Sequence, residues 1–329
     1  MAFFPFLATV KNSERISPNF QRVTFTGLDD MGPAGHIMDL RIKLVIPGDH
    51  GLPKMTGEEN WYDEWKAIDP DTRGSMRTYS IREFRRAGEH DEGANREAEL
   101  DIDFALHGVG TPDSGPAATW AVEAQPGDQL YVVAPQKDDE SGPGIEFQPG
   151  EATNVVILGD ETALPAMLRI ADEWPAELTG TMYCELVDSA DIPQIDFPAN
   201  LTVNWVPRSP EHAYGDLLVE SAAQLFEVEN PRGECTPPEP SSPKASTSDD
   251  AEPAPLVWET PAYSSFDDDT DAAEPASTVA ERFADTYFWI AGEAGMVTTI
   301  RRMLVKGAGI SRHRVSFMGY WKTGVKALG

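Results

Sequence analysis

The stretch "NVVILGDETALPAMLRIADEW", Asn154 to Trp174, marks the point where the pattern of the chain changes. It begins as an uninterrupted apolar run, which is typical of a strand buried on both faces. A turn follows in which Asp160 or Thr162 can cap a helix. The apolar residues then follow helical spacing at Leu164, Met167, Leu168, Ala171 and Trp174. A strand, a tight turn and a helix in this order indicate a parallel sheet covered by helices, with a ligand site beyond the carboxyl end of the strand.

The chain after this stretch repeats the same alternation. Buried-type strands are read at "TMYCELV", "LTVNWV", "YFWIAGE" and "RVSFMGY", and "MVTTIRRMLVKGAG" reads as a helix. "FWIAGEAGMVTTIRRML" is a second strand–turn–helix unit, and two such turns in one sheet either flank a single crevice or are purely structural. "KGAG" follows a helix rather than a strand, so it is not a dinucleotide fingerprint.

The chain before Gly150 has a different character. "RVTFTGL", "DLRIKLVIPG", "RTYSIREF", "ELDIDFALHG" and "DQLYVVAP" are short runs rich in β-branched and aromatic residues, bounded by Gly, Pro and Asp. This pattern predicts a small antiparallel barrel. We therefore expect a two-domain protein of the β plus α/β class, with a β-barrel over residues 1–150 and a parallel-sheet domain over residues 151–329.

One segment, residues 231–280, interrupts the second domain. It holds nine prolines and eleven acidic residues against two basic ones, Arg232 and Lys244. Such a composition cannot bury enough apolar surface to offset the entropy of ordering the chain. We expect a disordered or loosely attached insertion, which is either a tolerated surface feature or a regulatory element.

The composition excludes several classes of function. The formal net charge of −29 argues against binding to nucleic acid or to an anionic membrane. Neither of the two cysteines, Cys184 and Cys235, lies in a CxxC pair, so we expect no metal site. The apolar runs are too short to cross a bilayer, and the apolar N-terminus lacks the features of a signal peptide. We expect a monomeric cytoplasmic protein without stable membrane insertion.

The run "RTYSIREFR", Arg77 to Arg85, holds candidate ligand-binding residues. In a strand, Arg77, Tyr79 and Ile81 face one way, and the residues between them face the other. A tyrosine ring can lie flat on an aromatic ligand, and an arginine offers two donors to a phosphate. The alternative is an edge strand whose arginines serve solubility.

Two further stretches carry candidate residues. In "DIDFALHGVGTPDSGPAATWAV" a strand ends at His107, and a helix opens near Pro116 with Ser114 as its cap. Such a helix end can bind a pyrophosphate, or the stretch is a plain connection with a structural His107. In "HRVSFMGYWKTG" a strand ends at Tyr320-Trp321-Lys322. These residues either belong to the core or shield a flavin ring and attract an anionic substrate.

Together these motifs resemble the siderophore-interacting protein family, the flavin-dependent ferric-siderophore reductases of the ferredoxin–NADP reductase-like superfamily. The matching motifs are "RTYSIR", "DFALHGVGTPDSGPAATWA", "PGDQLYVVAP", "GDETALPA", "AGEAG" and "RVSFMGYWKTG", in the family's order over Val10 to Gly324. The insertion lies outside the resemblance. The resemblance implies a six-stranded antiparallel FAD-binding barrel followed by an NAD(P)H-binding-like domain, and it favours the flavin interpretation of "RTYSIR".

The resemblance also implies roles for residues of this chain. The isoalloxazine and the nearest phosphate would be held by Arg77, Tyr79, Ser80 and Arg82. The flavin edge and ribityl chain would be lined by Asp103 and His107. The pyrophosphate and adenine end would be formed by Gly115, Pro116, Ala117, Ala118 and Trp120. The nicotinamide crevice would be bordered by Gly159, Asp160, Glu161, Thr162, Ala163, Gly292 and Glu293. The ferric siderophore would be attracted by Lys322 with help from Arg312 or Arg314.

The implied activity is reduction of a ferric siderophore through FAD, which releases Fe(II). No side chain is expected to be catalytic, because the flavin carries the chemistry. The donor would be NADPH or NADH, with ferredoxin as the alternative, because the chain stops soon after "YWKTG" where members that use NAD(P)H directly carry a longer C-terminal helix. Two other functions stay open: a general flavin or quinone reductase on the same fold, and a siderophore-binding carrier without redox turnover.

Overall fold

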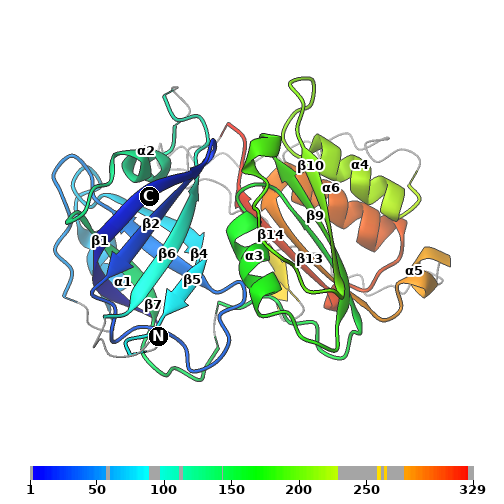
Figure 1. The fold of residues 1–329 in the computed structure, drawn as a ribbon, viewed down its shortest axis with the longest axis horizontal. Helices are drawn as coiled ribbons and strands as arrows, with labels where there is room; N and C mark the ends of the chain where they lie inside the picture. The colour runs from blue at the N-terminus through cyan, green and yellow to red at the C-terminus, as the bar shows by residue number, and fades with distance from the viewer. Residues whose placement is uncertain are drawn as a thin grey trace, which may run out of the picture.

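The computed structural model describes residues 3–56, 60–88, 97–110, 114–142, 144–228, 258–260, 263–264 and 278–324. They form two sheets that lie side by side, each with its own helices (Figure 1). The coarse prediction of an antiparallel barrel-like domain followed by a parallel-sheet domain is confirmed. None of the helices in these ranges is long and apolar enough to cross a bilayer.

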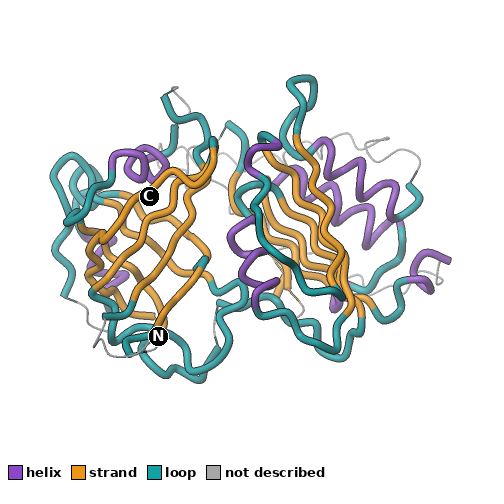
Figure 2. The backbone as a smooth tube through the Cα atoms, in the orientation of Figure 1, coloured by secondary structure: helices purple, strands orange, loops and turns teal. Residues whose placement is uncertain are grey.

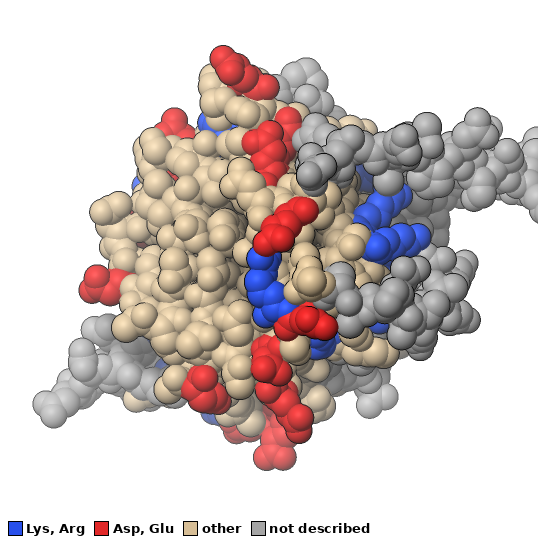
Figure 3. Space-filling view, turned by 90° about the vertical axis from the view of Figure 1, so that its right-hand side faces the viewer, with Lys and Arg blue, Asp and Glu red and all other residues tan. Residues whose placement is uncertain are grey.

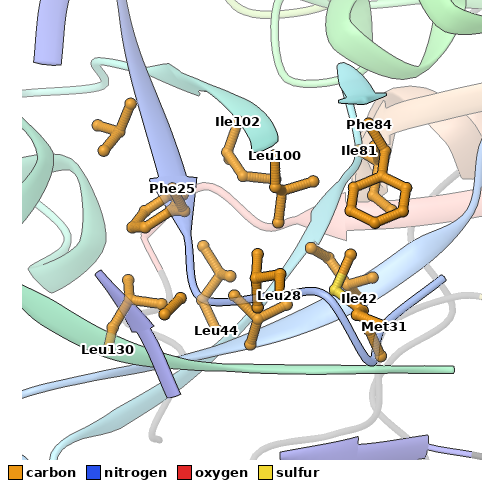
Figure 4. Packing of buried hydrophobic residues seen from close by; sticks show 14 of the residues in the cluster. Phe25, Leu28, Met31, Ile42, Leu44, Ile81, Phe84, Leu100, Ile102 and Leu130 are labelled. Atoms are coloured by element: carbon orange, nitrogen blue, oxygen red, sulfur yellow. The ribbon is translucent and has the colours of Figure 1, made fainter. Parts of the chain in front are cut away.

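The first sheet is antiparallel, with strand order β4-β3-β7-β1-β2-β6-β5. Its strands are β1 (Phe3–Ser17), β2 (Phe20–Thr26), β3 (Arg41–Ile46), β4 (Ser75–Ser80), β5 (Glu83–Arg85), β6 (Glu99–Ala105) and β7 (Gln129–Pro135). Apolar side chains from opposite walls meet in one core, as Figure 4 shows for Phe25, Leu44, Leu100 and Leu130. Helix α2 (Pro116–Glu123) packs against β2, β3, β4 and β6, and α1 (Trp61–Ala67) covers Val45 and Val133 on the outer surface.

The sheet has seven strands, so the expectation of six was wrong. The difference arises inside "RTYSIREF", which was taken as a single strand. β4 pairs with β3 up to Ser80, after which the Arg82 N–H donates to the carbonyl of Asp101 in β6, at 3.0 Å. β4 and β5 are therefore the two edges of the sheet, joined by the two residues between them rather than by a hydrogen-bonded ladder. The buried side chain of Ile81 fills the crossing point, and the sheet is a half-barrel that is not fully closed.

The second sheet has the order β10-β9-β8-β13-β14-β11-β12. Its parallel strands are β8 (Asn154–Gly159), β9 (Thr179–Leu186), β10 (Leu201–Pro207), β13 (Thr286–Glu293) and β14 (Val315–Trp321). Helix α3 (Leu164–Asp172) covers one face, and α4 (Asp216–Leu225) and α6 (Ala294–Arg301) cover the other (Figures 1 and 2). Every residue of β13 is buried, which explains its continuous apolar run.

Short elements complete this domain. The helix expected over "MVTTIRRMLVKGAG" changes at its end into a π-helical turn, η2 (Arg302–Gly307). The 3-10 turns are η1 (Ser189–Asp191) and η3 (Arg312–Arg314). Most of the predicted insertion, 231–280, lies outside the described residues. Within it, β11 (Trp258–Thr260) and β12 (Tyr263–Ser264) form an antiparallel extension beside β14, and helix α5 (Thr278–Arg282) leads into β13.

Hydrogen bonds fix the two sheets against each other. Asp39, with no exposed surface, comes from the first domain and accepts from the Trp289 indole N–H of β13 at 2.8 Å. Asp191 of η1 accepts from the Ser17 hydroxyl at 2.6 Å and from Asn19 through its backbone and its side chain. These contacts hold the carboxyl edge of the parallel sheet against the barrel, so the crevice between them is built by both domains.

Candidate functional site

Asp160 organises the carboxyl edge of the parallel sheet. It follows β8 and accepts four hydrogen bonds: from the N–H and hydroxyl of Thr162, from the N–H of Glu293 at the end of β13, and from the indole of Trp321 at the end of β14. Gly292 has a φ of +141°, and a Cβ at this position would lie 2.5 Å from the Asp160 carboxyl carbon. The predicted crevice residues Gly159, Asp160, Thr162, Gly292 and Glu293 are thus brought together, and Asp160 holds the strand ends in place.

Carboxylates of the chain itself occupy the helix starts along this edge. Glu185 of β9 accepts from the N–H groups of Gly215 and Leu218 at the start of α4, at 2.9 and 3.2 Å. Glu293 accepts from the Met296 N–H in the first turn of α6, and Asp160 accepts in the turn that enters α3. Helix starts carry partial positive charge and are the usual positions for a diphosphate. At α4 and α6 that charge is already matched, so a dinucleotide phosphate would have to be bound at another position.

A buried polar cluster lies beside Asp160 at the domain interface. Arg208, directly after β10, donates to Glu161 at 3.0 Å and to Glu185 at 2.5 Å. Its guanidinium also lies over the Tyr214 ring, 4.0 Å from the centroid. His107, from the loop after β6 of the barrel, places Nδ1 3.6 Å from Glu161 Oε1. A cavity of about 170 Å³ opens here, lined by Asn19, Leu106, His107, Gly108, Glu161, Val187 and Tyr214.

Burial changes the proton affinities in this cluster. It raises the pKa of Glu161 to about 8, with the nearby Asp160 adding to the effect and Arg208 opposing it. Burial lowers the pKa of His107, which keeps its imidazole neutral. The His107 ring lies 4.8 Å from the Trp321 ring, centroid to centroid. The sequence did not single out Arg208 or Tyr214, although Arg208 directly follows a predicted parallel strand, which is where site residues of such sheets lie.

On the barrel side, the residues of β4 have distinct neighbours. The half-buried Tyr79 lies 4.7 Å from the Phe104 ring, and burial raises the pKa of its hydroxyl. Burial lowers the pKa of Arg77, and Ser80 is buried at the end of the strand. Arg82 crosses to the second domain and pairs with Asp172 of α3 at 2.5 Å. Its Nε is buried and has no hydrogen-bond partner among the described residues.

Asp103 is not brought together with Tyr79. Alternate residues of β6 point to opposite faces, so Phe104 meets Tyr79 in the core while Asp103 faces the other way. Both Asp103 oxygens bind the guanidinium of Arg22 on β2, at 2.7 and 2.8 Å. Asp103 therefore forms a cross-strand ion pair on the face of β6 opposite to Phe104.

The start of α2 fits the diphosphate of FAD. Gly115 is the N-cap residue, Pro116 stands in the first turn, and none of the described side chains caps the helix. Ser114 is not the cap that the sequence suggested, because its hydroxyl bonds that of Thr119 at 2.6 Å. The first-turn N–H groups, including those of Ala117 and Ala118, lack partners within the helix, and the space in front of Gly115 is open. Trp120 lies further along and stacks on Phe25 of the barrel core.

The structure does not bring Lys322 together with Arg312 and Arg314. Lys322 is exposed after the carboxyl end of β14, whereas both arginines lie in η3 before its amino end. The seven-residue strand separates them by about 20 Å. Arg314 also donates to the carbonyls of Phe283 and Ala284. On the face of the second domain in Figure 3, basic side chains stand in small groups interrupted by acidic ones.

Comparison with known proteins identifies the family of this chain and several relatives. Residues 152–324 match the family described as siderophore-interacting protein, and residues 9–139 match the siderophore-interacting FAD-binding domain. The chain is 30% identical over 214 residues to ferric vibriobactin reductase ViuB of Vibrio cholerae, which covers 64% of this chain and 69% of ViuB. It is 30% identical over 165 residues to the NADPH-dependent ferric-chelate reductase of Escherichia coli, which covers 49% of this chain and 54% of that protein.

A solved structure shows the same likeness over nearly the whole chain. The siderophore-interacting protein SipS from Aeromonas hydrophila has a TM-score of 0.61 at 27% identity. The match covers 99% of this chain and 94% of SipS. The likeness to SipS therefore spans both domains.

Proposed function

The chain belongs to the siderophore-interacting protein family and carries its FAD-binding domain, and from this premise we propose that it is an FAD-dependent ferric-siderophore reductase. The observation that carries the proposal is the start of α2, which no described side chain caps, beside the "RTYSIR" strand of the barrel. A basic strand next to free helix N–H groups is what an aromatic ligand with a diphosphate requires.

The residues have separate tasks in this proposal. The α2 start and Arg77 hold the diphosphate, and Tyr79 and Ser80 position the ring. Bound FAD supplies the electron transfer to Fe(III), whose reduced form binds hard oxygen chelators more weakly. Exposed Lys322, at the carboxyl edge of the sheet, attracts an anionic ferric chelate without taking part in the chemistry.

The electron donor in this proposal is NADPH, in keeping with the name of the Escherichia coli relative. Ferredoxin is the second candidate, and the helix starts capped by Glu185 and Glu293 favour it, because they leave the usual diphosphate positions occupied. Cytoplasmic release of iron and a monomeric state remain predictions.

The visible spectrum of the purified protein, followed by anaerobic addition of NADPH, tests the proposal. We expect flavin absorption that bleaches with NADPH and returns when a ferric siderophore is added, with Fe(II) captured by a ferrous chelator. Flavin absorption that resists NADPH but bleaches with reduced ferredoxin selects the second donor. Equal turnover of free flavin or quinone would instead indicate a general reductase. A colourless protein that cannot take up FAD but binds a ferric chelate would indicate the carrier.

A further inference from the structure

Three carboxylates and one arginine are buried together at the domain interface. Asp160 and Glu161 are each 1% exposed, and Glu185 has no exposed surface. The side chain of Arg208 is 8% exposed and pairs with both glutamates. Three negative charges beside one positive charge are costly in a region shielded from water. One of the three acids is therefore expected to hold a proton.

The hydrogen bonds identify Glu161 as that acid. Asp160 accepts four hydrogen bonds, and Glu185 accepts two backbone N–H groups in addition to Arg208. Glu161 is held by Arg208 through Oε1, while its buried Oε2 has no hydrogen-bond partner among the described residues. Hydrogen bonds to a carboxylate stabilise its charged form, so the least supported acid retains the proton. The raised pKa of Glu161 agrees with this assignment.

His107 provides the matching group from the barrel domain. Its Nδ1 faces Glu161 Oε1 at 3.6 Å, and its Nε2 is buried with no partner in the described part of the chain. A neutral imidazole can accept a proton at one nitrogen and release it from the other. Glu161 and His107 both line the cavity of about 170 Å³ between the domains, which has room for water and offers polar groups to bind it.

We propose that Glu161 and His107 form a proton-exchange site, which supplies and recovers the proton that accompanies electron transfer in the crevice. The inference rests on the proposed function. A hydride from NADPH brings two electrons and one proton, so full reduction of FAD takes one further proton. Passing the two electrons to two ferric ions releases two protons. Glu161 gives up its carboxyl proton in the first phase and leaves a carboxylate paired with Arg208. In the second phase it regains one proton, and His107 and the cavity water carry the other to solvent.

Charged and titratable groups face Glu161 from every element that packs against it, and they affect its titration. They are Asp160 beside it, Cys184 and Glu185 on β9, Arg208 after β10, Tyr214 before α4 and His107 after β6. Arg208 stabilises the carboxylate, and Asp160 opposes it. The site can therefore lose and regain its proton near neutral pH.

Infrared titration of the full-length protein tests the site without turnover. With and without FAD, we expect the band of a protonated carboxylic acid to disappear as pH rises through about 8. Glu161→Gln should abolish this step, and the matched control Glu211→Gln, an exposed glutamate before Tyr214, should keep it. If wild-type protein shows no carboxylic acid band above pH 6, the proposal is overturned, and this result needs no variant to fold.

Proton movement during reduction gives the second readout. Stopped-flow reduction by NADPH at pH 7 with a pH indicator should show little proton uptake from solvent in wild-type protein, because Glu161 supplies the proton, whereas Glu161→Gln must take that proton from solvent, with flavin absorption retained. His107→Gln should slow the proton release that follows addition of a ferric chelate. The rate of flavin reduction in wild-type protein should fall as pH rises through about 8, and the rate in Glu161→Gln should be flat. Proton uptake in Glu161→Gln equal to that of wild-type protein, together with unchanged proton release in His107→Gln, would overturn the proton-exchange site and leave the reductase function standing. A wild-type protein that takes up no FAD would remove the reductase function, while the infrared titration would still report on Glu161.

Discussion

Gly292 lies directly against the carboxylate of Asp160, so this position has no room for a side chain. Its φ of +141° disfavours any side chain, and a Cβ would lie 2.5 Å from the Asp160 carboxyl carbon. We expect Gly292→Ala to lower the free energy of unfolding by about 1–3 kcal/mol, because of backbone strain and the displaced carboxylate. Chemical denaturation measures this loss. Gly307→Ala is the control, because its Cβ would meet only ordinary contacts, and an equal loss in both variants would contradict the argument.

Asp39 makes the interface sensitive to pH. Burial raises its pKa to about 6, whereas an unfolded aspartate titrates near 3.8. Because the folded pKa is the higher one, the stabilisation from its protonated form is present below about pH 4 and is lost as pH rises through about 6. Relative to Asp39→Asn, wild-type protein should lose ~1 kcal/mol of unfolding free energy between pH 5 and 7. Urea titrations of both proteins at these two values measure the difference, and a constant gap would refute it.

Lys322 is predicted to act by attraction alone. It is exposed at the carboxyl edge of the sheet, so its removal leaves the crevice intact. We expect Lys322→Ala to raise KM for an anionic ferric chelate several-fold, with kcat nearly unchanged, and the effect to shrink at high salt. Lys306→Ala, an exposed lysine after the far end of α6, serves as the control. An unchanged KM in Lys322→Ala would refute the role.

Some contacts between individual residues could be predicted from the sequence, and others could not. Gly292, Asp160 and Glu293 were predicted to meet, because parallel strands end at one edge. Arg314 was grouped with Lys322 through the family resemblance, and the seven-residue strand β14 separates them. Arg208 was missed because its partners come from other parts of the sheet, Glu161 from the turn after β8 and Glu185 from β9. Such a pairing depends on the packed sheet rather than on local pattern.

At the scale of elements, the start of α2 is the part most open to test. Gly115 has an extended backbone and open space, so it accepts a side chain. We expect Gly115→Asp to cap the helix and leave the unfolding free energy of the FAD-free protein unchanged or about 1 kcal/mol higher. The added carboxylate should also repel the diphosphate and weaken FAD binding about tenfold or more, a loss of ~1.4 kcal/mol.

Fluorescence titration of the FAD-free protein measures this affinity. Gly115→Asn is the matched control, since it caps equally well without a charge and should weaken binding less. Equal affinity in wild-type and Gly115→Asp would place the diphosphate elsewhere.

Which segments form strands was predictable from the sequence, but the point where one strand ends and the next begins was less so. Apolar alternation identified β2 and β6, and the continuous run of β13 identified a buried strand. The break of "RTYSIREF" into β4 and β5 was not visible, because Ile81 continues the alternation. What ends β4 is the lack of a further partner on β3 together with the nearness of β6, and this depends on the curvature of the whole sheet.

At the scale of the molecule, function depends on how firmly the two domains are held. Asp191 of the second domain is 4% exposed and accepts three hydrogen bonds from Ser17 and Asn19 of the barrel. Asn19 also lines the cavity that holds His107 and Glu161. Loss of Asp191 should therefore loosen the crevice as well as lower stability.

We expect Asp191→Ala to cost about 2–3 kcal/mol and to separate the unfolding of the two domains, because the half-buried donors of Ser17 and Asn19 lose a charged acceptor that spans the interface. Calorimetry should then show two transitions, or one broadened transition, in place of a single sharp one. Asp188→Ala is the matched control in the same turn, since Asp188 is exposed and caps η1 within its own domain through the Ala190 N–H. Asp188→Ala should cost ~1 kcal/mol and keep a single transition. If both variants unfold alike, the Asp191 contacts do not couple the domains, and the crevice must be held by other contacts such as that of Asp39 with Trp289.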